Sequence, residues 1–390
     1  MTVIIFLIVL SVLIFVHELG HFLIARLFKV RVDEFAIGFP PRLFSIKKGG
    51  TEYSINLIPL GGYVKIYGEN PEDALSPDNI LSKPRWQQAL VLIAGVTFNA
   101  LFAWLLFTSS LMIGAKAPVG DFPAEYATRP SVMITGIAPG SPAQIAGLKT
   151  GDEIYAVLSG VSTSSASVAS TTAGSAVNVI KFADSKYASA TSSVLKSSEI
   201  REAIILSTTT LGLLVNRGGE LKTIVTIPKD GIDGVQVGKK GLGIMMSDVA
   251  TVKLPLFMAI SSGFTETVDI TKEIVTSTYD FLGRAFRGKA SSNEVTGPVG
   301  IASHVGEAAS LGWVYLANFA AFISLNLAVL NLLPIPALDG GRLVVVILES
   351  IRRKSFNQKV LQIANSVSFI LLIGLMIYIT FQDVIALIFK

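Results

Sequence analysis

The residues best suited to chemistry are two histidines and a glutamate close to the N-terminus. They form the run His17-Glu18-Leu19-Gly20-His21, which has the pattern H-E-x-x-H. On a helix, positions four apart lie on one face, so both imidazoles can hold a single zinc ion. The glutamate between them can handle the protons of an attacking water molecule. The pattern therefore predicts the core of a metallopeptidase site.

The surroundings of this pattern make it more specific. Segment 2–27 is apolar and long enough to span a bilayer, which takes about 20 residues. Ionisable side chains inside a span cost about 2.5 kcal/mol or more each unless they are paired. A helix without a function would not hold three of them within one turn. A signal peptide is the alternative for this segment, but no Lys or Arg and no A-x-A cleavage pattern precedes Arg26.

A catalytic zinc site needs a third protein ligand and one open position. The chain has no cysteine, and its one further histidine, His304, lies in a stretch expected outside the membrane. Asp339 is the better candidate, because it is the sole acid in the apolar stretch 314–346. Two prolines break the helix before it, and broken backbone at membrane depth is tolerated mainly where it lines a cavity. The alternative is that Asp339 caps a helix or pairs with Arg342.

Four apolar segments set the fold class. Apolar residues make up 51% of the chain and charged residues 15%, whereas soluble chains carry about 25% charged residues. The net charge of +4 is spread without a basic block, so nucleic-acid binding has no support. We therefore predict a polytopic α-helical membrane protein with about four transmembrane helices, at 2–27, 89–113, 314–346 and 367–389.

The loops between these spans predict the orientation. Loop 28–88 carries eight Lys and Arg residues and loop 347–366 carries four. Short basic loops favour the cytoplasm, so both loops are expected there. Both termini and region 114–313 are then expected on the outer side. Within the first loop, segments 51–58 and 63–67 are predicted to form a membrane-associated β-hairpin. Its edge could pair with an unwound substrate, and the alternative is a solvated hairpin with no substrate role.

The outward region contains a predicted β-rich domain at 115–250. The run 139–154 resembles the start of a PDZ domain of the bacterial protease type. PDZ domains bind extended peptides by strand addition, and a folded spacer with a closed groove is the alternative. The insert 159–195 is rich in Ser, Ala and Thr, a composition typical of mobile loops. The predicted elements of this domain are strand 132–137, helix 198–206, and strands 211–216 and 221–227.

Two flanking parts complete the predicted organisation. Residues 1–113 form the first half of a membrane core and 314–390 form the second half. Between the outward domain and the second half, 251–313 is expected to be a linker region that contains an amphipathic helix over 253–290.

Two motifs together carry a resemblance to a known family. H-E-L-G-H in the first span and N-x-x-P-x-P-x-L-D-G in a later one resemble the site-2 protease family of intramembrane zinc metalloproteases. The pair Phe98-Asn99 in the second span agrees with this. The outward insert is similar to that of the bacterial branch that includes the regulator-of-sigma-E protease. The resemblance implies that His17, His21 and Asp339 bind one Zn²⁺, that Glu18 is catalytic, and that Asn326, Asn331, Pro334 and Pro336 shape the substrate site.

The resemblance also implies an activity and a location. The expected enzyme is an intramembrane zinc metalloendopeptidase in the inner membrane of a bacterium, with its active site towards the cytoplasm. It would cut a single-span membrane protein, as the second cut of regulated intramembrane proteolysis, for example of an anti-sigma factor, or in clearing signal-peptide remnants. Its expected partners are these substrates, the lipid bilayer and extended peptides at the PDZ-like domain. A catalytically idle scaffold and a metal transporter are the alternatives.

Overall fold

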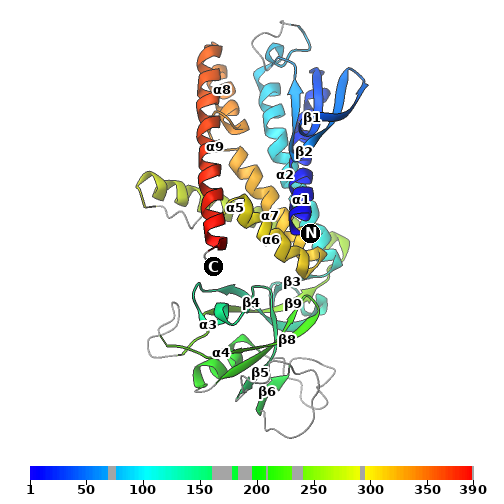
Figure 1. The fold of residues 1–390 in the computed structure, drawn as a ribbon. Helices are drawn as coiled ribbons and strands as arrows, with labels where there is room; N and C mark the ends of the chain where they lie inside the picture. The colour runs from blue at the N-terminus through cyan, green and yellow to red at the C-terminus, as the bar shows by residue number, and fades with distance from the viewer. Residues whose placement is uncertain are drawn as a thin grey trace. The chain divides into compact units, whose positions relative to one another are not determined.

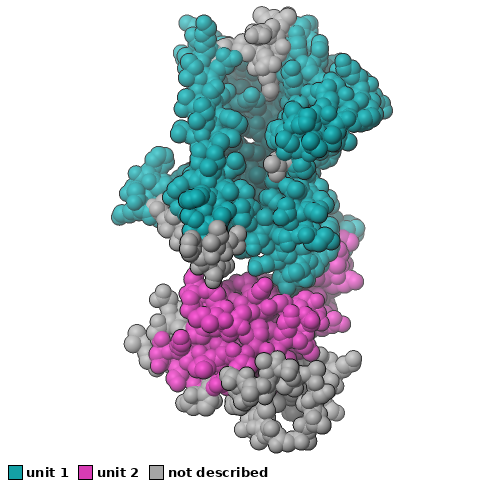
Figure 2. Space-filling model, viewed as in Figure 1, with its two compact units in different colours: residues 1–110, 256–390 teal, residues 111–255 magenta. Residues whose placement is uncertain are grey.

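The computed structural model describes residues 1–68, 76–159, 178–182, 196–207, 210–230, 240–289 and 295–388. The chain divides into two compact units, coloured separately in Figure 2. The first, here called the helical unit, comprises Met1–Ser110 and Leu256–Lys390. The second, here called the β unit, comprises Leu111–Pro255.

Four helices in the described part of the chain are long and apolar enough to cross a membrane. Such segments favour helices because a helix satisfies every backbone polar group internally, which lipid requires. The number of spans matches the sequence prediction. The helices are α1 (Thr2–Leu27), α2 (Arg85–Ile113), α7 (Trp313–Asn331) and α9 (Gln358–Ile388).

The predicted third span, 314–346, is broken before Asp339, as its two prolines predict. The structure ends α7 at Asn331 and begins a separate helix, α8 (Asp339–Arg352), after a turn. The prolines in the turn cannot donate to a helical ladder, which is the reason for the break. A Cβ on Gly340 would lie 2.5 Å from the carbonyl oxygen of Leu333, so only glycine lets α8 start this close to the turn. Asp339 is thereby placed at the first position of α8.

The predicted hairpin in the first loop is also wrong in its pairing. Segments 51–58 and 63–67 do not pair with each other, because both belong to one strand, β2 (Thr51–Ile66). Its antiparallel partner is β1 (Val32–Lys48), which the sequence analysis missed. Phe35 of β1 pairs with both Tyr53 and Val64 of β2. Residues 62–66 pair with β1 alone in the described part of the chain, and β2 lies against α1 (Figure 1).

Two further helices complete the helical unit. Helix α5 (Leu256–Phe286) covers most of the amphipathic segment predicted at 253–290. Helix α6 (Pro298–Leu311) was not predicted, and it packs against α1, α7 and α9. The Asp383 carboxylate of α9 accepts hydrogen bonds from backbone N–H groups of Gly297 and Gly300, which fixes the start of α6. A short 3₁₀ helix, η1 (Ile80–Ser82), precedes α2.

The β unit is built on one seven-stranded sheet in the order β3-β9-β4-β5-β7-β8, with β6 paired to β5. Its core includes Val132, Ile154 and Leu213, and Ile200 of α4 packs onto the same cluster. The helix and strands predicted for this region are present. The insert 159–195 lies mostly outside the described residues, and its residues 178–182 form β6. The elements are β3 (Ala115–Pro118), η2 (Ala124–Tyr126), β4 (Ala127–Ile137), α3 (Pro142–Ile145), β5 (Glu153–Ser159), β6 (Asn178–Phe182), α4 (Ser197–Leu206), β7 (Leu211–Arg217), β8 (Glu220–Thr226) and β9 (Ile244–Val252).

Candidate metal centre

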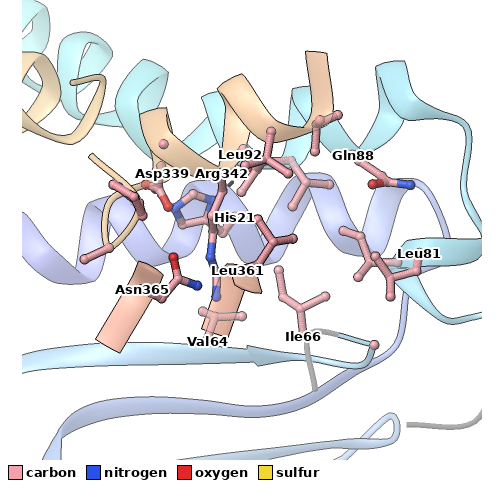
Figure 3. Close-up of a pocket in the computed structure, with 18 of the residues that line it drawn as sticks. His21, Val64, Ile66, Leu81, Gln88, Leu92, Asp339, Arg342, Leu361 and Asn365 are labelled. Atoms are coloured by element: carbon pink, nitrogen blue, oxygen red, sulfur yellow. Dashed lines mark hydrogen bonds and ion pairs between the residues drawn. The ribbon is translucent and has the colours of Figure 1, made fainter. Parts of the chain in front are cut away.

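The two histidines of α1 and the first residue of α8 converge on one point. Nε2 of His17 lies 3.0 Å from Oδ2 of Asp339, and Nε2 of His21 lies 3.2 Å from the same oxygen. The two imidazole Nε2 atoms are 3.2 Å apart. Figure 3 shows His21 and Asp339 pointing towards each other. The structure thus brings together the three residues that the sequence predicts as ligands.

The chemistry and spacing of these atoms fit zinc. Three ligands held about 2.0–2.2 Å from one tetrahedral ion lie little more than 3 Å from one another, as the three atoms here do. Nitrogen and carboxylate oxygen are both common zinc donors. His17 and His21 are buried, and three protein ligands leave the fourth position open for chemistry.

The orientation of His21 is set by the backbone of α2. Its Nδ1 lies 2.8 Å from the carbonyl oxygen of Val91. A carbonyl can only accept, so Nδ1 carries the proton and Nε2 keeps its lone pair for a metal. The sequence analysis missed this contact, because a backbone carbonyl leaves no signal in residue types.

Glycine residues give α1 and α2 the close approach that this contact needs. A Cβ on Gly95 of α2 would lie 2.6 Å from Cε1 and 2.8 Å from Nε2 of His17, and it would also meet the ring of His21. A Cβ on Gly20 of α1 would lie 3.0 Å from the Phe98 ring. The sequence analysis gave neither glycine a role, although a glycine inside an apolar span is a signal of close packing.

Glu18 lies beside the three candidate ligands and borders the same cavity. This cavity measures about 670 Å³ and is lined by parts of α1, α2, β2, α8 and α9. The carboxylate of Glu18 interacts with the backbone N–H of Val64 in the 62–66 segment of β2. Figure 3 shows Val64 and Asn365 of α9 facing this cavity. The arrangement places a carboxylate beside both the candidate ligands and the cavity.

The cavity wall also contains an ion pair. Nη1 of Arg85 lies 2.9 Å from Oε2 of Glu349, and both residues line the cavity wall. Oε1 of Glu349 accepts a hydrogen bond from the backbone N–H of Phe356. The pair joins the start of α2 to α8 and to the chain that follows it. Sequence reasoning gave Glu349 no role and used Arg85 only as one of the charges of loop 28–88.

Of the four predicted substrate-binding residues, two lie at the candidate site and two do not line its cavity. Nδ2 of Asn331 lies 3.3 Å from Nε2 of His17, next to the candidate ligands. Pro336 lines the cavity. Asn326 donates to the carbonyl oxygen of Phe322 in its own helix at 2.8 Å. Neither Asn326 nor Pro334 is among the described residues that line the cavity.

Comparisons with known proteins identify the family of this chain. The family model for peptidase family M50 matches residues 5–375. A protein of Clostridium perfringens is 32% identical over 378 residues, and the match covers 96% of each chain. One of Fusobacterium nucleatum is 34% identical over 388 residues, with 98% of each chain covered. Both carry the name "putative zinc metalloprotease". Since the family match runs through both halves of the chain that supply the site, this protein belongs to peptidase family M50, the site-2 proteases, and is a zinc metalloprotease of the membrane.

Proposed function

We propose that this enzyme hydrolyses a peptide bond within or next to the transmembrane segment of a single-span membrane protein. The observation that carries the proposal is the position of the site. The candidate ligands lie on α1 and at the start of α8, and the cavity beside them is lined by three candidate spans, α1, α2 and α9, and by a strand edge. A substrate that reaches this cavity does so from a membrane-embedded position.

In this proposal the three candidate ligands bind zinc, and Glu18 transfers protons. His17, His21 and Asp339 hold the zinc, which when bound polarises the scissile carbonyl and lowers the pKa of water. Glu18 accepts a proton from the attacking water and delivers it to the leaving nitrogen. The interaction of its carboxylate with the Val64 N–H orients it towards the cavity.

The edge of β2 is the proposed docking strand for the substrate. A peptide bond in a helical span is shielded, so the helix must unwind before cleavage. An extended chain can add to a strand whose outer edge is open. Residues 62–66 pair with β1 on one side in the described part of the chain, and Tyr63, Val64 and Ile66 line the cavity. Pairing there would hold the scissile bond beside Glu18.

Charge and connectivity support a cellular setting for this activity. The basic loops 28–88 and 347–366 support an inner membrane location with the active site towards the cytoplasm. The β unit, which the sequence likens to a PDZ domain, would then lie outside. In this arrangement it would exclude substrates with bulky outer domains. That suits a second cut, for example of an anti-sigma factor, or the removal of signal-peptide remnants.

A paired comparison tests the proposal. Membranes from cells with wild-type protein and with Glu18→Gln are compared for truncated single-span proteins that accumulate only in the variant. The purified variant should keep its zinc and lose cleavage of such a protein about 10²–10⁴-fold. Unchanged membrane proteomes and equal turnover would favour an idle scaffold. Zinc movement across vesicles that depends on His17 would favour a transporter.

A further inference from the structure

A buried amide on α2 lies behind His17, on the side away from the other candidate ligands. Asn99 is fully buried, and its Nδ2 lies 3.3 Å from Nδ1 of His17. Its Oδ1 is buried without a hydrogen-bond partner among the described residues. A buried acceptor without a partner costs about 1–3 kcal/mol, so this arrangement calls for a physical reason.

The geometry of His17 decides which amide atom should face it. Nε2 of His17 points at Oδ2 of Asp339 and at Nε2 of His21, so Nε2 must offer the lone pair to a metal. The proton of the neutral ring then lies on Nδ1, and the group facing Nδ1 must accept it. An NH₂ group cannot do so. The oxygen and nitrogen of an amide exchange places by a 180° rotation, which brings Oδ1 of Asn99 to Nδ1.

We propose that Asn99 is a positioning residue: its Oδ1 accepts a hydrogen bond from Nδ1–H of His17 and holds that ring as an Nε2 metal ligand. The inference rests on the proposed ligand role of His17. Zinc-binding imidazoles usually donate their second N–H to a carboxylate, a carbonyl or water, and these partners affect metal affinity. His21 satisfies this rule through the Val91 carbonyl, and Asn99 supplies the matching acceptor for His17.

A second contact fixes the position of Asn99 itself. Oγ of Ser324, a fully buried residue of α7, donates to the backbone carbonyl oxygen of Asn99 at 2.8 Å. Around this contact, Ala103 of α2 packs with Ala321 and Leu325 of α7. The bond therefore anchors α2 to the helix that leads towards Asp339. This packing sets the position of Asn99 along α2 relative to His17, so that position does not depend on the side-chain amide alone.

Two substitutions of similar size test whether Asn99 acts as a hydrogen-bond acceptor or only fills space between the helices. Asn99→Asp keeps an acceptor and removes the NH₂ donor, whereas Asn99→Leu removes both. Zinc affinity is measured by chelator competition on the purified full-length protein. Asn99→Leu should weaken it about 10–100-fold, and Asn99→Asp should keep it within a few-fold or tighten it. Thr97→Val, which removes an exposed hydroxyl bonded to Ile93 in the same helix, is the matched control.

The ring proton gives a readout that is independent of zinc. Only three histidines are present, so ¹⁵N-histidine spectra of the zinc-free protein with His304→Gln contain two rings. His17 should carry its proton on Nδ1 in the parent and in Asn99→Asp. It should shift towards the Nε2–H form in Asn99→Leu.

Two outcomes would overturn the inference. One is equal loss of zinc affinity in Asn99→Asp and Asn99→Leu, which would show that the NH₂ group or the packing matters instead. The other is an unchanged His17 tautomer in Asn99→Leu. Failure of the proposed function looks different, because zinc binding would then be absent from the parent or unaffected by His17→Ala.

Discussion

Oδ2 of Asp339 lies 3.0 Å from Nε2 of His17, although 322 residues separate the two along the chain. The contact joins the two halves of the helical unit at the candidate metal centre. If it represents shared zinc ligation, purified protein should hold about one zinc per chain, as one-site geometry requires. His21→Ala and Asp339→Ala should each lose it, as elemental analysis of the purified proteins would show.

A matched control exists for this prediction. His304 is half exposed and lies near Glu307, and it is not one of the three candidate ligands. His304→Ala should keep the full zinc content. Full zinc retention in both His21→Ala and Asp339→Ala would overturn the ligand assignment.

Gly95 should be as sensitive to substitution as a ligand. A methyl group there would press on the rings of His17 and His21, so Gly95→Ala should lower zinc content or push the helices apart. Gly374 is the control, because its Cβ would meet nothing within 4 Å. Gly374→Ala should bind zinc normally and unfold no more easily than the parent. Equal zinc content and equal thermal unfolding in both variants would contradict the packing argument.

The cluster of candidate metal ligands could be predicted because its signals are local. His17, Glu18 and His21 lie within one helical turn, and Asp339 stands out as an acid in an apolar stretch after two prolines. The surroundings of the ligands were not predictable in the same way. The Val91 carbonyl and Gly95 act only once α2 has a defined rotation against α1, and periodicity does not give that rotation.

The strand errors have a related cause. Segments 51–58 and 63–67 look like two strands of a hairpin because Gly61-Gly62 separates them. Phe35 pairs with both, so each finds its partner in β1 and the glycine pair only bends one long strand. A Cβ on Gly62 would lie 2.7 Å from the carbonyl oxygen of Ala36. Gly62 is therefore needed because the two strands pack closely at this point. A glycine pair in a sequence is usually interpreted as a turn, which is why this role was missed.

Val64 allows a test of the docking edge. Its backbone N–H interacts with the Glu18 carboxylate, and Val64 lies on the part of β2 that lines the cavity. Val64→Pro removes that N–H, and proline is tolerated at an outward edge position. Cleavage should fall at least tenfold with zinc content unchanged. Val64→Ala keeps the N–H and should retain most activity, so equal activity of the two variants would remove the edge from the mechanism.

Orientation in the membrane can be checked by labelling, because the chain has no cysteine. Cysteines placed at Ser82 and Lys354, both exposed and in the basic loops, should resist an impermeant thiol reagent in intact cells. A cysteine at Glu220, exposed in the β unit, should react. All three should react after the cells are opened. The reverse pattern in intact cells would overturn the proposed orientation and the side assigned to the β unit.

The β unit should act as a gate. Spans resemble one another in side chains, so an intramembrane enzyme needs another way to reject intact proteins, and an outer domain can do so by bulk. Deleting 120–245 and inserting a short Gly/Ser linker removes most of the unit. The deletion spares β3 and most of β9, which pair from Ala115↔Val252 to Pro118↔Val249, so the cut ends already lie side by side.

The deletion variant should keep zinc and cut both a trimmed and an untrimmed form of one single-span substrate. The full-length enzyme should cut only the trimmed form. The ratio of the two cleavage rates is the measurement, because it cancels any general loss of activity caused by the deletion. A rise in the untrimmed-to-trimmed ratio supports exclusion by bulk. If the unit instead recruits substrate through a peptide groove, both rates fall together and the ratio stays where it was, which would reject the gate in favour of recruitment.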